Sequence, residues 1–155
     1  MAKVVMIAAP DQFRDEELFV PKEMLEKAGH QTFIASKKIG KCKGKLGGSI
    51  DATLLVKDIR VEDYDAVVFV GGGGSSVYFE DPDAFRIAGE FNRQGKLVTA
   101  ICIAPVILAN AGLLKGKRAT VWVDGADTIR SKGAEYTGAE VETDGNIITG
   151  NGPAS

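Results

Sequence analysis

The chain has 155 residues, of which 45% are hydrophobic and 26% are charged, and its formal net charge is −2. These values are typical of one globular domain. The balance of charge offers no electrostatic case for a nucleic-acid or membrane partner, and no apolar run approaches the roughly 20 residues that span a bilayer. We therefore expect a single domain over residues 1–155, located in the cytoplasm.

The cysteine and histidine content argues against a disulfide framework or a zinc site. Cys42 and Cys102 are the two cysteines, they are far apart in the sequence, and His30 is the one histidine. Free thiols in a reducing compartment fit this pattern better. We expect neither a metal nor a cofactor.

The first third of the chain predicts a strand, a helix, a second strand and a hairpin. An apolar run predicts a buried strand over residues 3–9, and apolar side chains at helical spacing predict a helix over 16–28. A short strand is expected over 31–36. The segment 37–52 is rich in lysine and glycine, which indicates a hairpin excursion from the main sheet.

The rest of the chain continues the alternation of strands and helices. Asp81 is a plausible N-cap for a helix that begins at Pro82, and Asp144-Gly145 is a strong hairpin signal. The predicted strands are 65–70, 96–101, 119–123, 140–142 and 146–149, and the predicted helices are 82–93 and 104–110. This alternation is typical of an α/β fold with a mainly parallel sheet covered on both faces.

Functional sites in such folds open at the carboxyl ends of the strands. That rule selects three segments, which are residues 10–17, 71–78 and 102–105. They come from different parts of the chain, and the fold is expected to bring them together.

Cys102 stands where a buried strand turns directly into a helix. Such a turn exposes the side chain above the sheet in a strained conformation, and a helix N-terminus favours the thiolate. Pro105 fits the first turn of that helix, where no amide donor is needed. The alternative is an ordinary buried core cysteine.

The run Gly71 to Gly74 leaves backbone amides unobstructed at a strand end. Such amides can stabilise an oxyanion, although a plain flexible turn is the alternative. A phosphate loop is disfavoured because no Lys-Ser/Thr pair follows, and a dinucleotide fingerprint lacks its third glycine.

Four carboxylates, Asp11, Asp15, Glu16 and Glu17, follow the first strand. Favourable charge at a helix N-terminus explains most of them, but Glu17 precedes the apolar Leu18 and is expected to face inward. The acids argue against a flavin-phosphate cradle. A receiver-type site would also need an aspartate where this chain has Val70.

Five lysines, at positions 37, 38, 41, 43 and 45, surround Cys42. We interpret this segment as a solvated hairpin. The alternative is that the lysines lower the pKa of Cys42 and make it a second oxidisable thiol.

Taken together, these residues resemble the DJ-1/PfpI superfamily. The matching pieces are Phe13-x-Asp15-x-Glu17-Leu18-x-x-Pro21, Gly71-Gly72, Ala100-Ile101-Cys102-x-Ala104-Pro105, Ala111-Gly112-Leu113-Leu114-Lys115-Gly116-Lys117 and Asp144-Gly145-Asn146-x-Ile148-Thr149. The resemblance implies a flavodoxin-like three-layer sandwich of the class I glutamine amidotransferase type that forms dimers or larger homo-oligomers.

The resemblance also assigns roles to residues. Cys102 is the implied nucleophile, Glu17 the acid at its sulfur, and Gly71 and Gly72 the oxyanion-hole amides, with Ile103 and Trp122 beside them. A thiolate close to a carboxyl disfavours ionisation of that carboxyl, so Glu17 is expected to be protonated and to donate a hydrogen bond.

Three departures from the family pattern matter. Ile103 stands where PfpI-like peptidases carry a histidine, and Trp122 replaces a histidine used by DJ-1-like members; Trp122 is then either a pocket wall or a core residue. The family continues past Gly152-Pro153 into a last helix, which is not present in this sequence. Without an imidazole to protonate a leaving amine, we expect weak or absent peptidase activity.

Three functions follow, in order of preference. The first is a glyoxalase or deglycase that acts on small reactive carbonyls through Cys102 and Glu17, with a small molecule as its partner. The second is an oxidation sensor or protective chaperone in which an oxidant converts Cys102 to a sulfinate. The third is a PfpI-type cysteine peptidase, and a flavodoxin-like carrier comes last.

Overall fold

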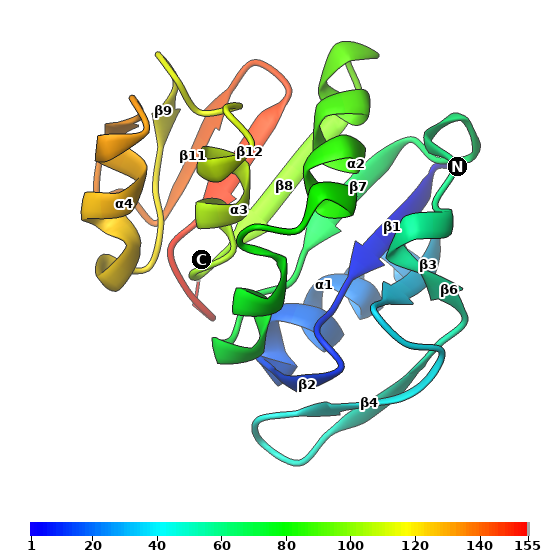
Figure 1. Ribbon diagram of the computed structural model, residues 1–155. Helices are drawn as coiled ribbons and strands as arrows, with labels where there is room; N and C mark the ends of the chain where they lie inside the picture. Colours follow the sequence, from blue (N-terminus) through cyan, green and yellow to red (C-terminus); the bar gives the residue numbers. More distant parts are fainter. Residues whose placement is uncertain (155) are drawn as a thin grey trace.

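The computed structural model describes residues 1–154; Ser155, the last residue of the predicted domain, lies outside them. A seven-stranded sheet in the order β11-β12-β8-β7-β1-β3-β6 runs through the molecule (Figure 1). Its neighbouring strands are parallel, except that β11 is antiparallel to β12. The strands are β1 (Lys3–Ile7), β3 (Gln31–Ser36), β6 (Leu54–Leu55), β7 (Ala66–Phe69), β8 (Leu97–Ile101), β11 (Val141–Asp144) and β12 (Ile147–Gly150).

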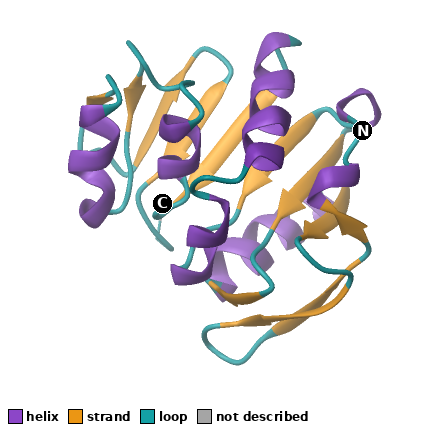
Figure 2. Cartoon of the chain, viewed as in Figure 1, coloured by secondary structure: helices purple, strands orange, loops and turns teal. Residues whose placement is uncertain are grey.

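Helices cover both faces of this sheet, as Figures 1 and 2 show. On one face, Val5 and Ile7 of β1 belong to a core with Ile87 and Phe91 of α2. On the other face, Val4 and Met6 join Leu18 of α1 in a second core. The helices are α1 (Asp15–Lys27), α2 (Pro82–Arg93), α3 (Pro105–Asn110) and α4 (Ala126–Ser131), with 3-10 turns η1 (Val56–Asp58), η2 (Val61–Asp63), η3 (Gly73–Tyr78) and η4 (Val123–Gly125).

This architecture confirms the predicted α/β sandwich with a mainly parallel sheet. The strand at 31–36 and the helix at 82–93 have the predicted bounds, and the Asp81 side chain caps α2 by accepting a hydrogen bond from the N–H of Asp83. Alternate residues of β1 and of β7 belong to opposite cores, which is the period of two expected of extended backbone. Over residues 1–154, no helix has both the length and the apolar character that crossing a membrane requires.

The strand predicted over residues 119–123 is wrong. The extended backbone there is limited to β9 (Arg118–Ala119), which pairs with β10 (Glu135–Tyr136) outside the main sheet. The N–H of Thr120 donates instead to Oγ1 of Thr149, and the N–H of Trp122 donates to the carbonyl of Cys102. Because these donors are already used, the segment has no strand ladder to join. The short helix α4 that follows was not predicted.

The predicted hairpin excursion is present. β2 (Asp11–Phe13), β4 (Gly40–Gly44) and β5 (Ser49–Ala52) form a small separate sheet at the start of α1. The Asp15 carboxylate holds the turn by accepting hydrogen bonds from the N–H groups of Leu46 (2.8 Å) and Gly48 (2.7 Å). Cys42 of β4 is completely buried in the core that contains Phe13 and Leu18, which argues against a second oxidisable thiol in the hairpin.

The replacement Asp15→Ala is expected to loosen the hairpin specifically. It removes two charge-assisted hydrogen bonds from a partly exposed site, which should lower the free energy of unfolding by about 1–2 kcal/mol. Urea unfolding measures that loss, and hydrogen exchange should accelerate at the amides of Leu46 and Gly48. Glu23→Ala, an exposed change on the same helix, is the control; similar exchange in both variants would contradict the prediction.

Candidate functional site

Cys102 lies on a strained turn between β8 and α3. Its φ is +63°, a left-handed conformation that side chains other than glycine rarely adopt. The turn is held by backbone hydrogen bonds, because the N–H of Cys102 donates to Gly150 (2.9 Å) and its carbonyl accepts from Trp122 (2.7 Å). Strain of this kind costs about 1–3 kcal/mol and persists only where the surroundings enforce it. The predicted strained turn between strand and helix is therefore present, with Cys102 partly exposed.

Glu17 reaches the same point from the first turn of α1. Its side chain is only 1% exposed, and within the described residues neither carboxyl oxygen has a hydrogen-bond partner of good geometry. A Cβ added at Gly71 would collide with Oε1 of Glu17 and would lie 2.6 Å from Cβ of Cys102. The absence of a side chain at Gly71 is thus what lets the carboxyl and the cysteine approach each other.

Burial changes the acid–base chemistry of both groups. It raises the pKa of Glu17 from 4.5 to about 7, although the neighbouring Cys102 thiol, the charge of Arg14 and the Gly71 N–H oppose the rise. Burial also raises the pKa of the Cys102 thiol, and the charge of an ionised Glu17 raises it further. The helix N-terminus was expected to favour the thiolate; the net direction is the opposite.

The amides of the site point differently from the prediction. The N–H groups of Gly72 and Ile103 form hydrogen bonds with the Cys102 sulfur and lower its pKa, whereas the N–H of Gly71 is directed at Glu17. Gly72 has a φ of +100°, and a Cβ there would lie 2.6 Å from the carbonyl oxygen of Gln12. Gly71 and Gly72 were the two predicted oxyanion donors. The N–H of Gly72 is directed at the sulfur, and the second N–H directed at the sulfur belongs to Ile103 and not to Gly71.

A cavity of about 460 Å³ opens above the sulfur. Ile103 and Trp122 line it, as predicted, and Trp122 is 44% exposed, which places it in the pocket wall rather than in the core. The lining residues are Arg14, Lys45, Gly72, Gly73, Cys102, Ile103, Trp122, Asp124 and Pro153.

Three charged residues of this cavity were missed by the sequence analysis. Arg14 lies among the carboxylates that precede the first helix, and Lys45 lies in the lysine-rich segment that predicts a solvated hairpin. Neither pattern indicates a residue of the cavity. Asp124 follows the segment that was mistaken for a strand. Only their positions in the folded chain identify these three residues as part of the cavity.

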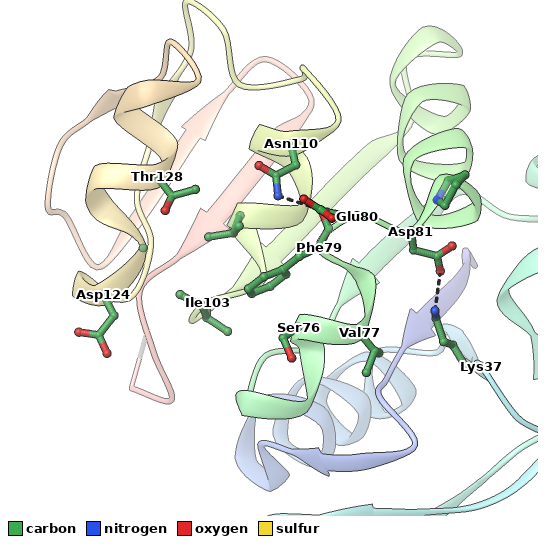
Figure 3. Close-up of a pocket in the computed structure, with 13 residues that line it drawn as sticks. Lys37, Ser76, Val77, Phe79, Glu80, Asp81, Ile103, Asn110, Asp124 and Thr128 are labelled. Carbon is green, nitrogen blue, oxygen red and sulfur yellow. Dashed lines mark hydrogen bonds and ion pairs between the residues drawn. The ribbon is translucent and has the colours of Figure 1, made fainter.

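A second cavity of about 590 Å³ adjoins the first, and Ile103 and Asp124 line both (Figure 3). Its rim carries an ion pair between Lys37 and Asp81, with 3.7 Å between Nζ and Oδ2. The sequence did not predict this cavity, because it lies between η3 and the unpredicted turn at η4.

Neither cavity is lined by a histidine over residues 1–154. His30 lies at the amino ends of β1 and β3, where its Nδ1 accepts a hydrogen bond from the N–H of Ala2 (2.9 Å). Nor do these residues contain three or more His, Cys, Asp or Glu side chains gathered to hold a metal ion.

Comparison with known proteins gives this geometry its context. The model of the DJ-1/PfpI family matches residues 2–155. An uncharacterised protein of Methanocaldococcus jannaschii is 41% identical over 98% of this chain and 76% of its own, and a deglycase of Thermococcus kodakarensis is 34% identical over 96% and 90%. The crystal structure of a ThiJ/PfpI domain protein from Brachyspira murdochii superposes with a TM-score of 0.96 at 34% identity, over 98% of this chain and 88% of that one. The chain belongs to the DJ-1/PfpI family.

Proposed function

We propose that this protein converts small reactive carbonyl compounds in a glyoxalase or deglycase type of reaction, with Cys102 as nucleophile and Glu17 as proton carrier. The observation that carries the proposal is the buried Glu17 carboxyl against the Cys102 turn, beneath an open cavity. The deglycase name of a relative that is 34% identical supports the same chemistry.

The raised pKa values of Glu17 and Cys102 suit a proton that passes between the carboxyl and the thiol. With a pKa of about 7, Glu17 is partly ionised near neutral pH and accepts the thiol proton as Sγ attacks. An S–C bond forms, the C=O π bond breaks, and its electron pair moves to the oxygen. The N–H groups of Gly72 and Ile103, which already face the sulfur, are the nearest donors for that oxyanion. Glu17 then returns the proton to the oxygen, which leaves a hemithioacetal.

With a 2-oxoaldehyde the reaction continues without an external oxidant. Glu17 removes the proton from the former aldehyde carbon and delivers it to the neighbouring ketone carbon, while the hydroxyl proton of the hemithioacetal passes to the ketone oxygen, so that one carbon is oxidised and the other reduced. The product is a thioester on Cys102. Water breaks the S–C bond, releasing a 2-hydroxy acid and restoring the thiol. The sum is one 2-oxoaldehyde plus one water giving one 2-hydroxy acid.

The raised thiol pKa favours this reaction over an oxidation sensor. A sensor depends on a standing population of thiolate, and burial keeps Cys102 mainly protonated at neutral pH. The carbonyl reaction needs the thiolate only at the moment of attack, when Glu17 takes the proton.

Replacing either member of the pair should abolish turnover of methylglyoxal. Cys102→Ala removes the attacking atom, and Glu17→Gln removes the proton acceptor, which should cost at least about a hundredfold in kcat/KM. Loss of methylglyoxal and formation of lactate are measured together. Cys42→Ala, which changes the cysteine outside the cavity, is the control. Equal rates in wild type, Cys102→Ala and Glu17→Gln would eliminate the proposal.

The dependence of rate on pH should report Glu17. Below its pKa the carboxyl is protonated and cannot accept the thiol proton, so kcat/KM should rise as the pH increases through about 7 and then level off. In Glu17→Gln this limb should disappear, leaving a much slower reaction that rises only at alkaline pH as the thiol itself ionises. A wild-type profile that is flat between pH 6 and about pH 8 is incompatible with the assigned base.

Glu17 should also make folding stability depend on pH. Its pKa rises from 4.5 to about 7 on folding, so the ionised carboxyl opposes the native state. The native state is therefore favoured below the unfolded value, and this advantage is lost as the pH rises through the folded value. The full difference corresponds to roughly 3 kcal/mol.

Glu17→Gln is accordingly expected to be more stable than wild type at pH 8, by roughly 2–3 kcal/mol or about 5–10 °C in Tm. The difference should shrink as the pH falls and should vanish below pH 4.5, where the wild-type carboxyl becomes protonated in the unfolded state as well as in the folded state. Thermal unfolding followed by circular dichroism across this range measures it. Glu23→Gln, an exposed change on the same helix, should show no such trend; a pH-independent offset for Glu17→Gln would contradict the linkage.

A further inference from the structure

The Cys102 cavity is bordered by cations on one side. We propose that it selects carbonyl compounds that also carry an anionic group, a carboxylate or a phosphate, and that Arg14 and Lys45 bind this group. The inference rests on the proposed function, because it names the substrate class of the same site. Both residues line the cavity together with Cys102.

Arg14 is placed to act on the reacting atoms. It precedes α1, its backbone N–H donates to the carbonyl of Gly71 (2.9 Å), and its Nε forms an ion pair with Glu16 (2.7 Å). The guanidinium has two further nitrogens, whose planar arrangement matches a carboxylate or a phosphate. Its charge also lowers the pKa of Glu17 and so favours the ionised carboxyl beside the sulfur.

Lys45 brings a second charge from the hairpin. Its backbone N–H donates to the carbonyl of Phe13 (2.8 Å), which places it beside Arg14. The segment 37–50 contains five lysines and no carboxylate. Of these lysines, Lys37 is the one with an ion pair among the described residues. Lys45 therefore adds a positive charge at the Cys102 cavity, which opposes the negative charge of Glu16.

Asp124 determines which way an anionic substrate would lie. It lines the Cys102 cavity and also the second cavity shown in Figure 3, whereas Arg14 and Lys45 line the first alone. Among the charged residues that line the Cys102 cavity, Asp124 thus lies toward the second cavity, and Arg14 and Lys45 lie away from it. The anionic group of the substrate should point toward Arg14 and Lys45, with its carbonyl over Cys102 and its apolar part against Trp122.

Two alkylating agents of nearly equal size test this charge selection without requiring turnover. Iodoacetate is an anion and iodoacetamide is neutral; with each, Sγ forms an S–C bond and iodide leaves with the electron pair. The ratio of their rate constants at Cys102, followed by mass spectrometry of the peptide that contains it, cancels any change in thiolate population. The ratio therefore reports how the cavity receives an anion.

Arg14→Gln and Lys45→Gln should each lower the iodoacetate-to-iodoacetamide ratio about two- to fivefold, and the double variant should lower it further. Asp124→Asn should raise it. Lys43→Gln is the matched control, because Lys43 is an exposed lysine of the same hairpin that lines neither of the two cavities over residues 1–154. A ratio that is the same in wild type, the double variant and Asp124→Asn would overturn the inference.

Protection of Cys102 against iodoacetamide separates the two kinds of anion. Stronger protection by inorganic phosphate than by acetate at equal ionic strength assigns a phosphate-bearing substrate, and the reverse order assigns a carboxylate. Protection by neither, in wild type, counts against the site. Because alkylation needs no catalysis, a charge-dependent ratio together with absent methylglyoxal turnover would refute the proposed reaction and leave the anion site standing.

Discussion

The approach of the Glu17 carboxyl to Cys102 is the contact on which the rest of the site depends. It requires three segments to meet: the first turn of α1, the end of β7 and the turn after β8. Gly71 makes the meeting possible, since any side chain there would occupy the space of the carboxyl oxygen. The parallel sheet brings these segments to one edge, because the carboxyl ends of its strands lie side by side.

Two features of this contact oppose folding, and both lie at the Cys102 turn. Cys102 holds a left-handed backbone conformation, and Glu17 is buried without a hydrogen-bond partner of good geometry among residues 1–154. Two apolar cores on opposite faces of the sheet stabilise the scaffold around them. A strained nucleophile and a desolvated acid are what general acid–base chemistry at a thiol requires, so local instability and proposed activity have the same origin.

Much of this arrangement was predictable from the sequence, because it follows from rules that act along the chain. The spacing of apolar residues located most strands and helices. The rule that sites open at the carboxyl ends of parallel strands selected the segments that contain Glu17, Gly72 and Cys102. The directions of the amides were not predictable, since they depend on the positive φ of Gly72 and Cys102. The strand over 119–123 failed because Thr120 and Trp122 use their backbone donors in tertiary contacts that no local pattern reveals.

The raised pKa of Cys102 shows that a cysteine on a strained turn before a helix does not owe its acidity to the helix dipole alone. α3 begins at Pro105, three residues beyond Cys102, and it contains only six residues. Its N-terminus is therefore too distant and the helix too short to dominate over burial, and the thiol pKa rises. What the turn contributes is the pair of amides from Gly72 and Ile103 and the contact with a carboxyl of pKa about 7. In the proposed reaction, the Glu17 carboxyl and not the helix therefore determines when the Cys102 sulfur becomes a nucleophile.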